Sequence, residues 1–279
     1  MSKHWLITGT STGLGRIMVE RLLARGDKVA ATLRRRGSLD DLKAKYGSEL
    51  HVLTLDVTDA AQIRSIVREA FEVLGRVDIA VSNAGYGLFG AAEEVSDEQI
   101  ERQLATNLTG SIQFIRALLP YMRAQGGGRI VQVSSEGGQI AIPNFSLYHA
   151  TKWGIEGFVQ SVSQEVAPFG IDFVIAEPGP TATNFGAGLD HALSMACYEP
   201  TPAGDVRRAI TSGNFTVRGD AGKTVEAIIA AADAQQPPLR LALGSSAYES
   251  LRRCLAERLR QLEENRAIAL SADAIEQST

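Results

Sequence analysis

Short apolar runs alternate with longer amphipathic stretches through the first two thirds of the chain, and this alternation restricts the possible folds more than any other feature. We expect strands over residues 5–8, 28–33, 50–55, 77–82, 129–134 and 171–176, several of them almost wholly apolar, as is typical of strands covered on both faces. Helical spacing of apolar residues predicts helices over 13–25, 59–74, 96–123 and 147–169. Asp59 and the pair Ser96/Gln99 have the pattern of helix N-caps. Together these features predict a parallel sheet, doubly wound by right-handed crossovers, with helices on both faces.

The alternation ends at Pro178-Gly179-Pro180. Residues 181–219 are rich in Gly, Pro, Ala and Asn and predict short helical patches at best, and the part from 184 to 219 has the length of a substrate loop or lid. A helix over 222–234, a strand over 239–243 and a charged helix over 247–264 are expected next, the last within a C-terminal helical extension, 246–279. The added strand brings the sheet to about seven strands in a single domain spanning 1–279.

Three glycines, Gly9, Gly13 and Gly15, lie between the first expected strand and the first expected helix. Glycine allows positive φ and a close approach of the backbone to a ligand, and a helix N-terminus offers free N–H groups to phosphates. The neighbouring Ser11 and Thr12 can add hydroxyl donors. A tight turn without a ligand is the alternative, but the position after the first strand favours dinucleotide binding in a Rossmann-type α/β fold.

The end of the second expected strand indicates which dinucleotide is bound. NAD sites usually place an acidic residue there, on the ribose 2′-hydroxyl, but no acid lies between Val29 and Leu39. Arg34 stands at this position instead and can pair with a 2′-phosphate that a carboxylate would repel. The pattern therefore favours NADP(H) over a solvated loop charge at Arg34, and it leaves the roles of Arg35 and Arg36 open.

Tyr148 and Lys152 are four residues apart on an expected helix and so share one face. A phenol titrates near pH ~10, and a neighbouring cation lowers its pKa toward the range in which it can exchange protons. The spacing is common on exposed surfaces, so its meaning depends on neighbours. The pair Ser134-Ser135 ends an expected strand at the ligand-binding edge of the sheet, and Asn107 lies within a helix, where asparagine has no structural advantage. Tyr148, Lys152, Asn107 and one of these two serines form the candidate catalytic set.

In this order and spacing the motifs resemble those of the short-chain dehydrogenase/reductase family, over about residues 4–185. The matching segments are Thr8-Gly9-x3-Gly13-x-Gly15, Leu55-Asp56-Val57, Asn83-Ala84-Gly85, Asn107, Gly128 through Ser135, Tyr148-x3-Lys152 and Pro178-Gly179-Pro180-x2-Thr183. The pair Leu33-Arg34 resembles the NADP-preferring branch. Ser82 stands where the family often has a first asparagine, and residues from Asn184 onward match no motif.

The resemblance implies a role for each matching residue. Tyr148 would exchange a proton with the reacting oxygen, Lys152 would lower the pKa of the phenol and hold the nicotinamide ribose, and Ser135 would hydrogen-bond the reacting oxygen. Asn107 would anchor a water that links Lys152 to solvent. The cofactor-binding residues would be Gly9, Ser11, Thr12, Gly13, Leu14, Gly15, Arg34, Asp56, Val57, Asn83, Ala84, Gly85, Tyr148, Lys152, Pro178, Gly179, Thr181 and Thr183.

The activity implied is transfer of a hydride between NADP(H) and a small-molecule ketone, aldehyde or secondary alcohol, with reduction favoured. Two alternatives stay open: a lyase or epimerase on the same scaffold, and an NADP(H)-binding sensor or scaffold protein without turnover. Family members often form homodimers or homotetramers through two long helices, here the helices expected over 96–123 and 147–169.

Composition and charge exclude several other classes. The formal net charge is -4 and the densest basic run is Arg34-Arg35-Arg36, so we expect neither nucleic-acid binding nor an anionic membrane surface. No apolar run of about 18 residues predicts a membrane helix, and the first strand leaves no room for a signal peptide. Neither the two cysteines nor the histidines have metal-ligand spacing. These features predict a cytoplasmic protein without a metal site.

Overall fold

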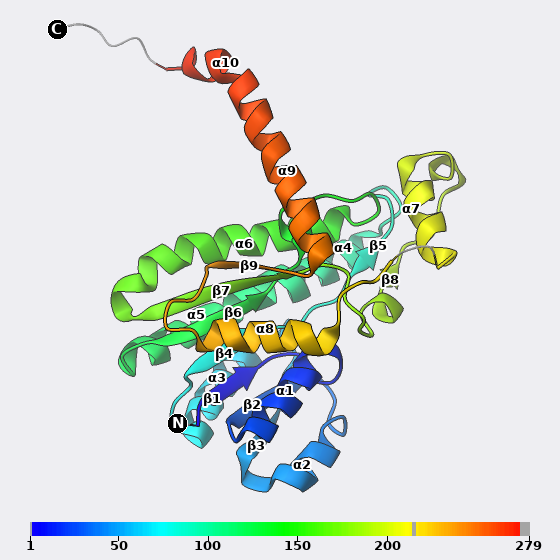
Figure 1. The fold of residues 1–279 in the computed structure, drawn as a ribbon. Helices are drawn as coiled ribbons and strands as arrows, with labels where there is room; N and C mark the ends of the chain where they lie inside the picture. The colour runs from blue at the N-terminus through cyan, green and yellow to red at the C-terminus, as the bar shows by residue number, and fades with distance from the viewer. Residues whose placement is uncertain (1, 214–215, 274–279) are drawn as a thin grey trace, which may run out of the picture.

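A seven-stranded parallel sheet forms the centre of the molecule in the computed structural model, which describes residues 2–213 and 216–273 (Figure 1). Its strands are β1 (His4–Ile7), β2 (Lys28–Leu33), β3 (Leu50–Thr54), β4 (Ile79–Ser82), β6 (Gly128–Val133), β7 (Ile171–Pro178) and β9 (Arg240–Leu243). They lie in the order β3-β2-β1-β4-β6-β7-β9, and each neighbouring pair is parallel. The order reverses between β1 and β4, and sheets of this kind bind ligands beyond the carboxyl ends of the strands at such a reversal. The predicted fold class is confirmed.

Helices cover both faces of the sheet. Residues of α1 (Gly13–Arg25), α2 (Asp40–Tyr46) and α8 (Ala221–Asp233) pack on one face, and residues of α3 (Ala60–Leu74), α5 (Gly110–Ala124) and α6 (Ser146–Val166) pack on the other. Because side chains alternate along a strand, Trp5 and Ile7 join the first layer and Leu6 joins the second. Burying a large apolar side chain contributes about 1.5–3 kcal/mol. The two layers therefore fix the strand ends that carry the predicted site.

The helix expected over 96–123 is interrupted. The Ser96/Gln99 capping box forms as predicted, but α4 (Asp97–Leu104) is followed by a π-helical turn, Ala105–Thr109, before α5 begins. Asn107 lies buried in that turn. Its amide Nδ2 donates to the carbonyl oxygen of Tyr86 at 2.7 Å, and its Oδ1 accepts from the Tyr86 N–H at 3.1 Å. The interruption thus coincides with a contact to a distant segment, which the periodicity of the helix could not reveal.

The segment expected to be irregular contains more structure than predicted. It forms α7 (Pro202–Thr211), and its strand β8 (Asp190–His191) pairs with β5 (Leu88–Phe89). Glu94 anchors this segment, because its buried carboxylate binds Arg207 of α7 at 2.6 Å and accepts from the Met195 N–H at 2.8 Å. Residues 214–215 of the predicted lid lie outside the described residues.

The C-terminal extension is a helix that projects away from the sheet. One residue separates β9 from α9 (Ser245–Glu264), and a short helix, α10 (Arg266–Leu270), follows it well beyond the rest of the molecule (Figure 1). Residues 274–279 of the predicted extension lie outside the described residues.

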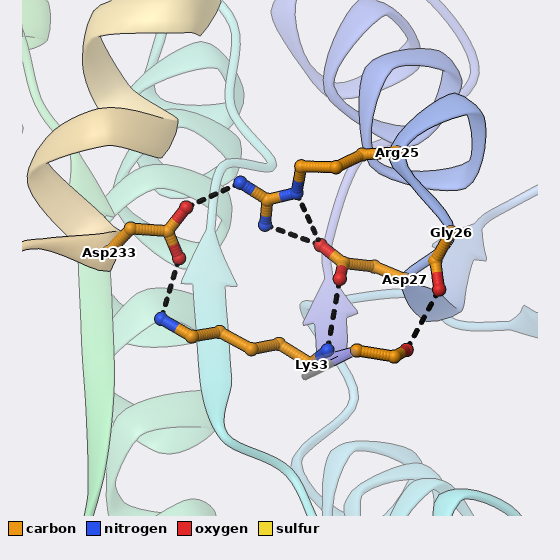
Figure 2. Close-up of a pocket in the computed structure, with 6 residues that line it drawn as sticks. Lys3, Arg25, Gly26, Asp27 and Asp233 are labelled. Atoms are coloured by element: carbon orange, nitrogen blue, oxygen red, sulfur yellow. Dashed lines mark hydrogen bonds and ion pairs between the residues drawn. The ribbon is translucent and has the colours of Figure 1, made fainter.

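The amino ends of the strands are closed by an ion-pair network that lines a cleft (Figure 2). Lys3 Nζ binds Asp233 Oδ1 at 2.6 Å, and Arg25 bridges Asp233 and the buried Asp27. Asp27 also accepts from Trp5 Nε1 at 3.1 Å. Because these charges are paired within the chain, at the edge opposite the predicted site, the network ties the N-terminus to the ends of α1 and α8.

Candidate active site

The predicted site residues gather at the carboxyl edge of the sheet. Each predicted segment follows a strand: Gly9–Gly15 follows β1, Arg34 follows β2, Asp56 and Val57 follow β3, Asn83–Gly85 follows β4, Ser135 follows β6, and Gly179–Thr183 follows β7. Parallel strands bring their carboxyl ends to one edge, so the topology alone places these segments together. α6 adds Tyr148 and Lys152 from one face of the sheet.

The glycine turn has the geometry of a backbone cradle. Gly9 and Gly13 have φ of 70° and 60°, the left-handed region that favours glycine. A Cβ on Gly15 would lie 2.3 Å from the carbonyl oxygen of Gly9, so this position has room only for hydrogen. A Cβ on Gly13 would lie 3.8 Å from Thr183 Cβ, at ordinary van der Waals distance, so the turn lies next to the loop after β7. The side chain of Thr12 does not cap α1, so the first N–H groups of this helix are free for an anion.

Asn83 holds this turn in place. Its Nδ2 donates to the carbonyl oxygens of Thr8 and Gly9, both at 2.9 Å. The hydroxyl of Thr8 accepts from the N–H groups of Asn83 and Ala84 at 2.9 and 3.1 Å. The ends of β1 and β4 are thereby tied together, which fixes the turn relative to the reversal in strand order.

Arg34 and Asp56 stand beside each other at the outer part of this edge. Arg34 is exposed and makes no ion pair within the part of the chain that the structure describes. The pKa of Asp56 is lowered because Thr58 donates to its carboxylate from both N–H and hydroxyl, and the charge of Arg34 lowers it further. Arg16 of α1 steadies the loop after Arg34, since it binds Asp41 at 2.6 Å and the Ser38 carbonyl oxygen.

Tyr148 and Lys152 are both buried. Lys152 Nζ lies 5.7 Å from the centre of the Tyr148 ring and donates to the Val133 carbonyl oxygen at 2.9 Å. Burial raises the pKa of Tyr148 to about 12, with a smaller opposing effect of a hydrogen bond to Ser135. Burial lowers the pKa of Lys152 to about 8, against the charge of Glu156, which raises it. The sequence predicts a lowered pKa for the phenol, but in this structure removal of water is the largest effect and raises it.

The two adjacent serines have different partners. Ser134 is buried and donates to Glu156 Oε1 at 2.5 Å. Ser135 is partly exposed, accepts from the Gly137 N–H at 3.1 Å and interacts with the Tyr148 hydroxyl. Ser134 is therefore committed to Glu156, and Ser135 is the serine whose hydroxyl lies at the Tyr148 phenol.

His149 supports the turn that follows Ser135. Its Nδ1 lies 2.8 Å from the Gly137 carbonyl oxygen, and its Nε2 accepts from the Ile142 N–H at 2.9 Å. Burial lowers the pKa of His149, so the ring is neutral and can make both bonds. The imidazole thus links both ends of the turn and is not free for a substrate.

The C-terminal helix supports the same turn from outside. Ser250 of α9 donates to Glu136 Oε2 at 2.5 Å, and Arg258 donates to the Gln139 carbonyl oxygen. The guanidinium of Arg258 also lies over the Trp153 ring, 4.4 Å from its centre. Burial raises the pKa of Glu136. Sequence reasoning did not connect this extension with the site, because the contacts join residues more than a hundred positions apart.

Two further buried carboxylates lie behind the site. Glu156 follows Lys152 by one helical turn, and Glu177 lies in β7. Arg240 binds Glu177 Oε1 at 2.7 Å and also pairs with Glu156. Burial and the charge of Glu156 raise the pKa of Glu177. This cluster gave no sequence signal, since glutamates are ordinarily exposed.

The segment expected to be a lid contacts Tyr148. The ring of Phe185 lies 5.7 Å from that of Tyr148, and a Cβ on Gly87 would lie 2.8 Å from Phe185 and 2.5 Å from Leu189. The ring centre of Phe145 lies 6.1 Å from that of Tyr148. Tyr148 thus lies beside two other aromatic rings, typical of a site for a partly apolar ligand.

Comparison with known proteins establishes the family. Residues 3–193 match the model of the short chain dehydrogenase family. The chain belongs to this family. It is 36% identical over 251 residues to oxidoreductase BOA17 of Botryotinia fuckeliana, covering 89% of this chain and 91% of that protein.

Solved structures agree with this assignment. A short-chain dehydrogenase from Streptomyces avermitilis superposes with a TM-score of 0.91 at 37% identity, covering 98% of this chain and 100% of that one. The closed form of serine dehydrogenase complexed with NADP+ superposes with a TM-score of 0.73 at 26% identity, covering 86% and 94%. The predicted family resemblance is confirmed.

Two classes of feature are not found in the described part of this short-chain dehydrogenase. Within residues 2–213 and 216–273, no helix is both long and apolar enough to cross a membrane. Over the same ranges, no three His, Cys, Asp or Glu side chains are grouped so that they could hold a metal ion.

Proposed function

We propose that this short-chain dehydrogenase is an NADP(H)-dependent reductase of ketones or aldehydes. The observation that carries the proposal is the burial of Tyr148 beside Lys152, with Ser135 in contact with the phenol, at the carboxyl edge of the sheet. A binding protein without turnover does not need this arrangement, whereas an enzyme that transfers a proton to a carbonyl oxygen does need it.

The chain's own geometry fits a dinucleotide. The turn from Gly9 to Gly15 leaves backbone N–H groups and the start of α1 open to a pyrophosphate, and Arg34 is free to pair with a 2′-phosphate. The neighbours Ser11, Thr12 and Leu14, with Val57, Gly85, Pro178 and Thr181, would complete the binding surface. When bound, the cofactor would supply the hydride, and the protein would supply position and charge.

The protein residues would handle the proton. With its pKa raised to about 12, Tyr148 keeps its proton at neutral pH and can act as an acid toward the carbonyl oxygen of a substrate. Ser135 would share that oxygen and hold it near the phenol. Lys152, whose pKa is lowered to about 8, would be cationic at neutral pH and stabilise negative charge that develops on Tyr148. Asn107 would hold the Tyr86 segment beside the site through its two bonds to that backbone.

The segment 184–219 would define the substrate. Phe185 and Leu189 stand over Gly87, and the rings of Phe185 and Phe145 lie beside that of Tyr148. These apolar side chains would exclude water and favour substrates with a hydrophobic part next to the carbonyl group. The ion pair between Arg207 and Glu94 would hold the segment in this place.

The test is NADPH oxidation, followed by absorbance, with a panel of aldehydes and ketones. We expect the wild type to turn over part of the panel. Tyr148→Phe should lose at least about a thousandfold in kcat while the Kd for NADPH stays nearly unchanged, because only the proton donor is removed. Full activity in this variant would refute the mechanism. Tight NADPH binding without turnover of any panel member would favour a sensor.

The choice of cofactor has its own test. Arg34→Asp places a carboxylate where the 2′-phosphate would bind, so we expect weaker NADPH binding and a preference shifted toward NADH. Arg35→Asp serves as a matched control of equal charge change in the same loop. An NADPH/NADH ratio unchanged by Arg34→Asp would show that other residues hold the 2′-phosphate.

A further inference from the structure

The outer half of α9 lacks the packing that holds its first turns. Ala247 and Leu251 are buried, and Ser250 and Arg258 contact the turn after Ser135. Beyond Arg258, every described residue of α9 and α10 is exposed, and the helix stands clear of the sheet (Figure 1). Helical segments of this length are marginally stable in water without packing.

An apolar stripe runs along this projecting part. Leu255, Leu259 and Leu262 are 48%, 58% and 63% exposed, and their spacing of four and three residues places them on one face. Leu251, one turn earlier, continues the stripe into the buried base of the helix. A continuous row of exposed leucines of this kind marks a surface for protein association.

We propose that a second copy of this chain covers the stripe, with its own α9 running antiparallel to the first. A two-fold contact requires a surface that is complementary to itself. The stripe meets this requirement: its centre is at Leu259, so an antiparallel copy places Leu255 of one chain near Leu262 of the other. This proposal is independent of the reaction proposed above.

The charges beside the stripe support the antiparallel direction. Arg252 and Glu263 are eleven residues apart, about three helical turns, and therefore lie on the same flank of the stripe. In an antiparallel pair the same flanks face each other, so Arg252 of each chain meets Glu263 of the other. The midpoint of these two residues falls within two residues of Leu259. Neither side chain forms an ion pair within residues 2–213 and 216–273, so both are available.

The ends of the two helices support the same arrangement. Ile268 and Leu270 of α10 are exposed at the tip, and Tyr248 is exposed at the base of α9. An antiparallel copy brings the tip of one chain beside the base of the other, so these remaining apolar side chains would meet. A parallel pair would place base beside base and tip beside tip, and it would bring opposite flanks together, so Arg252 would not meet Glu263.

The test is the mass of the purified full-length protein by light scattering at micromolar concentration. Leu259→Glu places two carboxylates at the centre of the interface, so we expect the mass to fall to half that of the wild type. Val73→Glu is the matched control, since Val73 is an exposed apolar residue on α3, away from the stripe. A mass unchanged by Leu259→Glu would overturn the proposal, and far-ultraviolet circular dichroism checks that the variant is folded.

Charge reversal tests the direction. Arg252→Glu and Glu263→Arg should each weaken association at least about tenfold, because each puts like charges opposite one another in both halves of the contact. The double variant restores opposite charges and should recover the wild-type association. Association that stays weak in the double variant would overturn the antiparallel arrangement.

Discussion

Replacing Arg240 should show how strongly the buried cluster behind the site depends on one cation. The side chains of Glu156 and Glu177 are each only 2% exposed, and Arg240 pairs with both. Two other hydrogen bonds remain if Arg240 is lost: Ser134 to Glu156, and Gln139 to Glu177 at 2.8 Å. Arg240→Leu keeps much of the apolar stem but leaves two negative charges facing each other without a counterion.

The magnitude follows from the cost of an unpaired buried charge. Removing one partner of a buried ion pair typically costs about 3–5 kcal/mol. Arg240 is 32% exposed, so water screens part of its interaction, and the remaining hydrogen bonds offset part of the loss. We therefore expect the free energy of unfolding to fall by about 3 kcal/mol at a pH near 8.

This loss should depend on pH. The pKa of Glu177 is already raised by burial and by the charge of Glu156, and removal of Arg240 raises it further. A carboxyl group with a raised pKa in the folded state loses its stabilising contribution as the pH rises through that pKa. At a pH near 5.5 the cluster can bind a proton instead, so we expect a clearly smaller loss there than at a pH near 8.

Urea unfolding at the two pH values measures both effects. Arg240→Lys retains a positive charge and should lose less stability than Arg240→Leu. Arg253→Leu, at an exposed position of α9, controls for the loss of an arginine as such. A loss below about 1 kcal/mol at a pH near 8, or the same loss at both values, would refute the reasoning.

Two further predictions concern the site itself. Gly15→Ala should weaken NADPH binding and lower the free energy of unfolding by about 1–3 kcal/mol, because its Cβ would lie 2.3 Å from the Gly9 carbonyl oxygen. Isothermal titration measures the binding and urea unfolding measures the stability. Gly157→Ala is the control, since its Cβ would meet nothing within 4 Å, and it should show neither loss. Glu156→Gln should shift the alkaline limb of the pH profile of kcat to lower pH, because it removes a charge that raises the pKa of both Lys152 and Tyr148. An alkaline limb that does not move would contradict this. Glu165→Gln, at an exposed position of the same helix, is the control.

The parallel strands could be predicted from sequence because their signal is local. A run such as 28–33 is apolar throughout, and β2 has those bounds in the structure. Glycine turns and N-caps are also local, and Asp59 caps α3 as expected. α2 was missed because its seven residues carry little apolar periodicity. The break at Ala105–Thr109 was missed because the bonds between Asn107 and Tyr86 depend on the fold.

The candidate site shows the same division. Segments that follow strands could be placed at one edge from the order of the elements alone. The supporting residues could not, because Glu177 and Arg240 meet only when β7 and β9 pair. Ser250 likewise reaches Glu136 only through the docking of α9. These contacts join charged or polar residues, and from the sequence each of them would be predicted to lie exposed at the surface.

The pKa of Tyr148 depends on the burial of the site as well as on which residues form it. From spacing alone, Lys152 lowers the pKa of the phenol, which would favour a base that takes a proton from an alcohol. In the folded chain both groups lose water, and the removal of water raises the pKa of Tyr148 to about 12 while it lowers that of Lys152 to about 8. The protonated phenol is then the resting form at neutral pH. Burial, more than the spacing of the pair, therefore sets the direction of both pKa shifts.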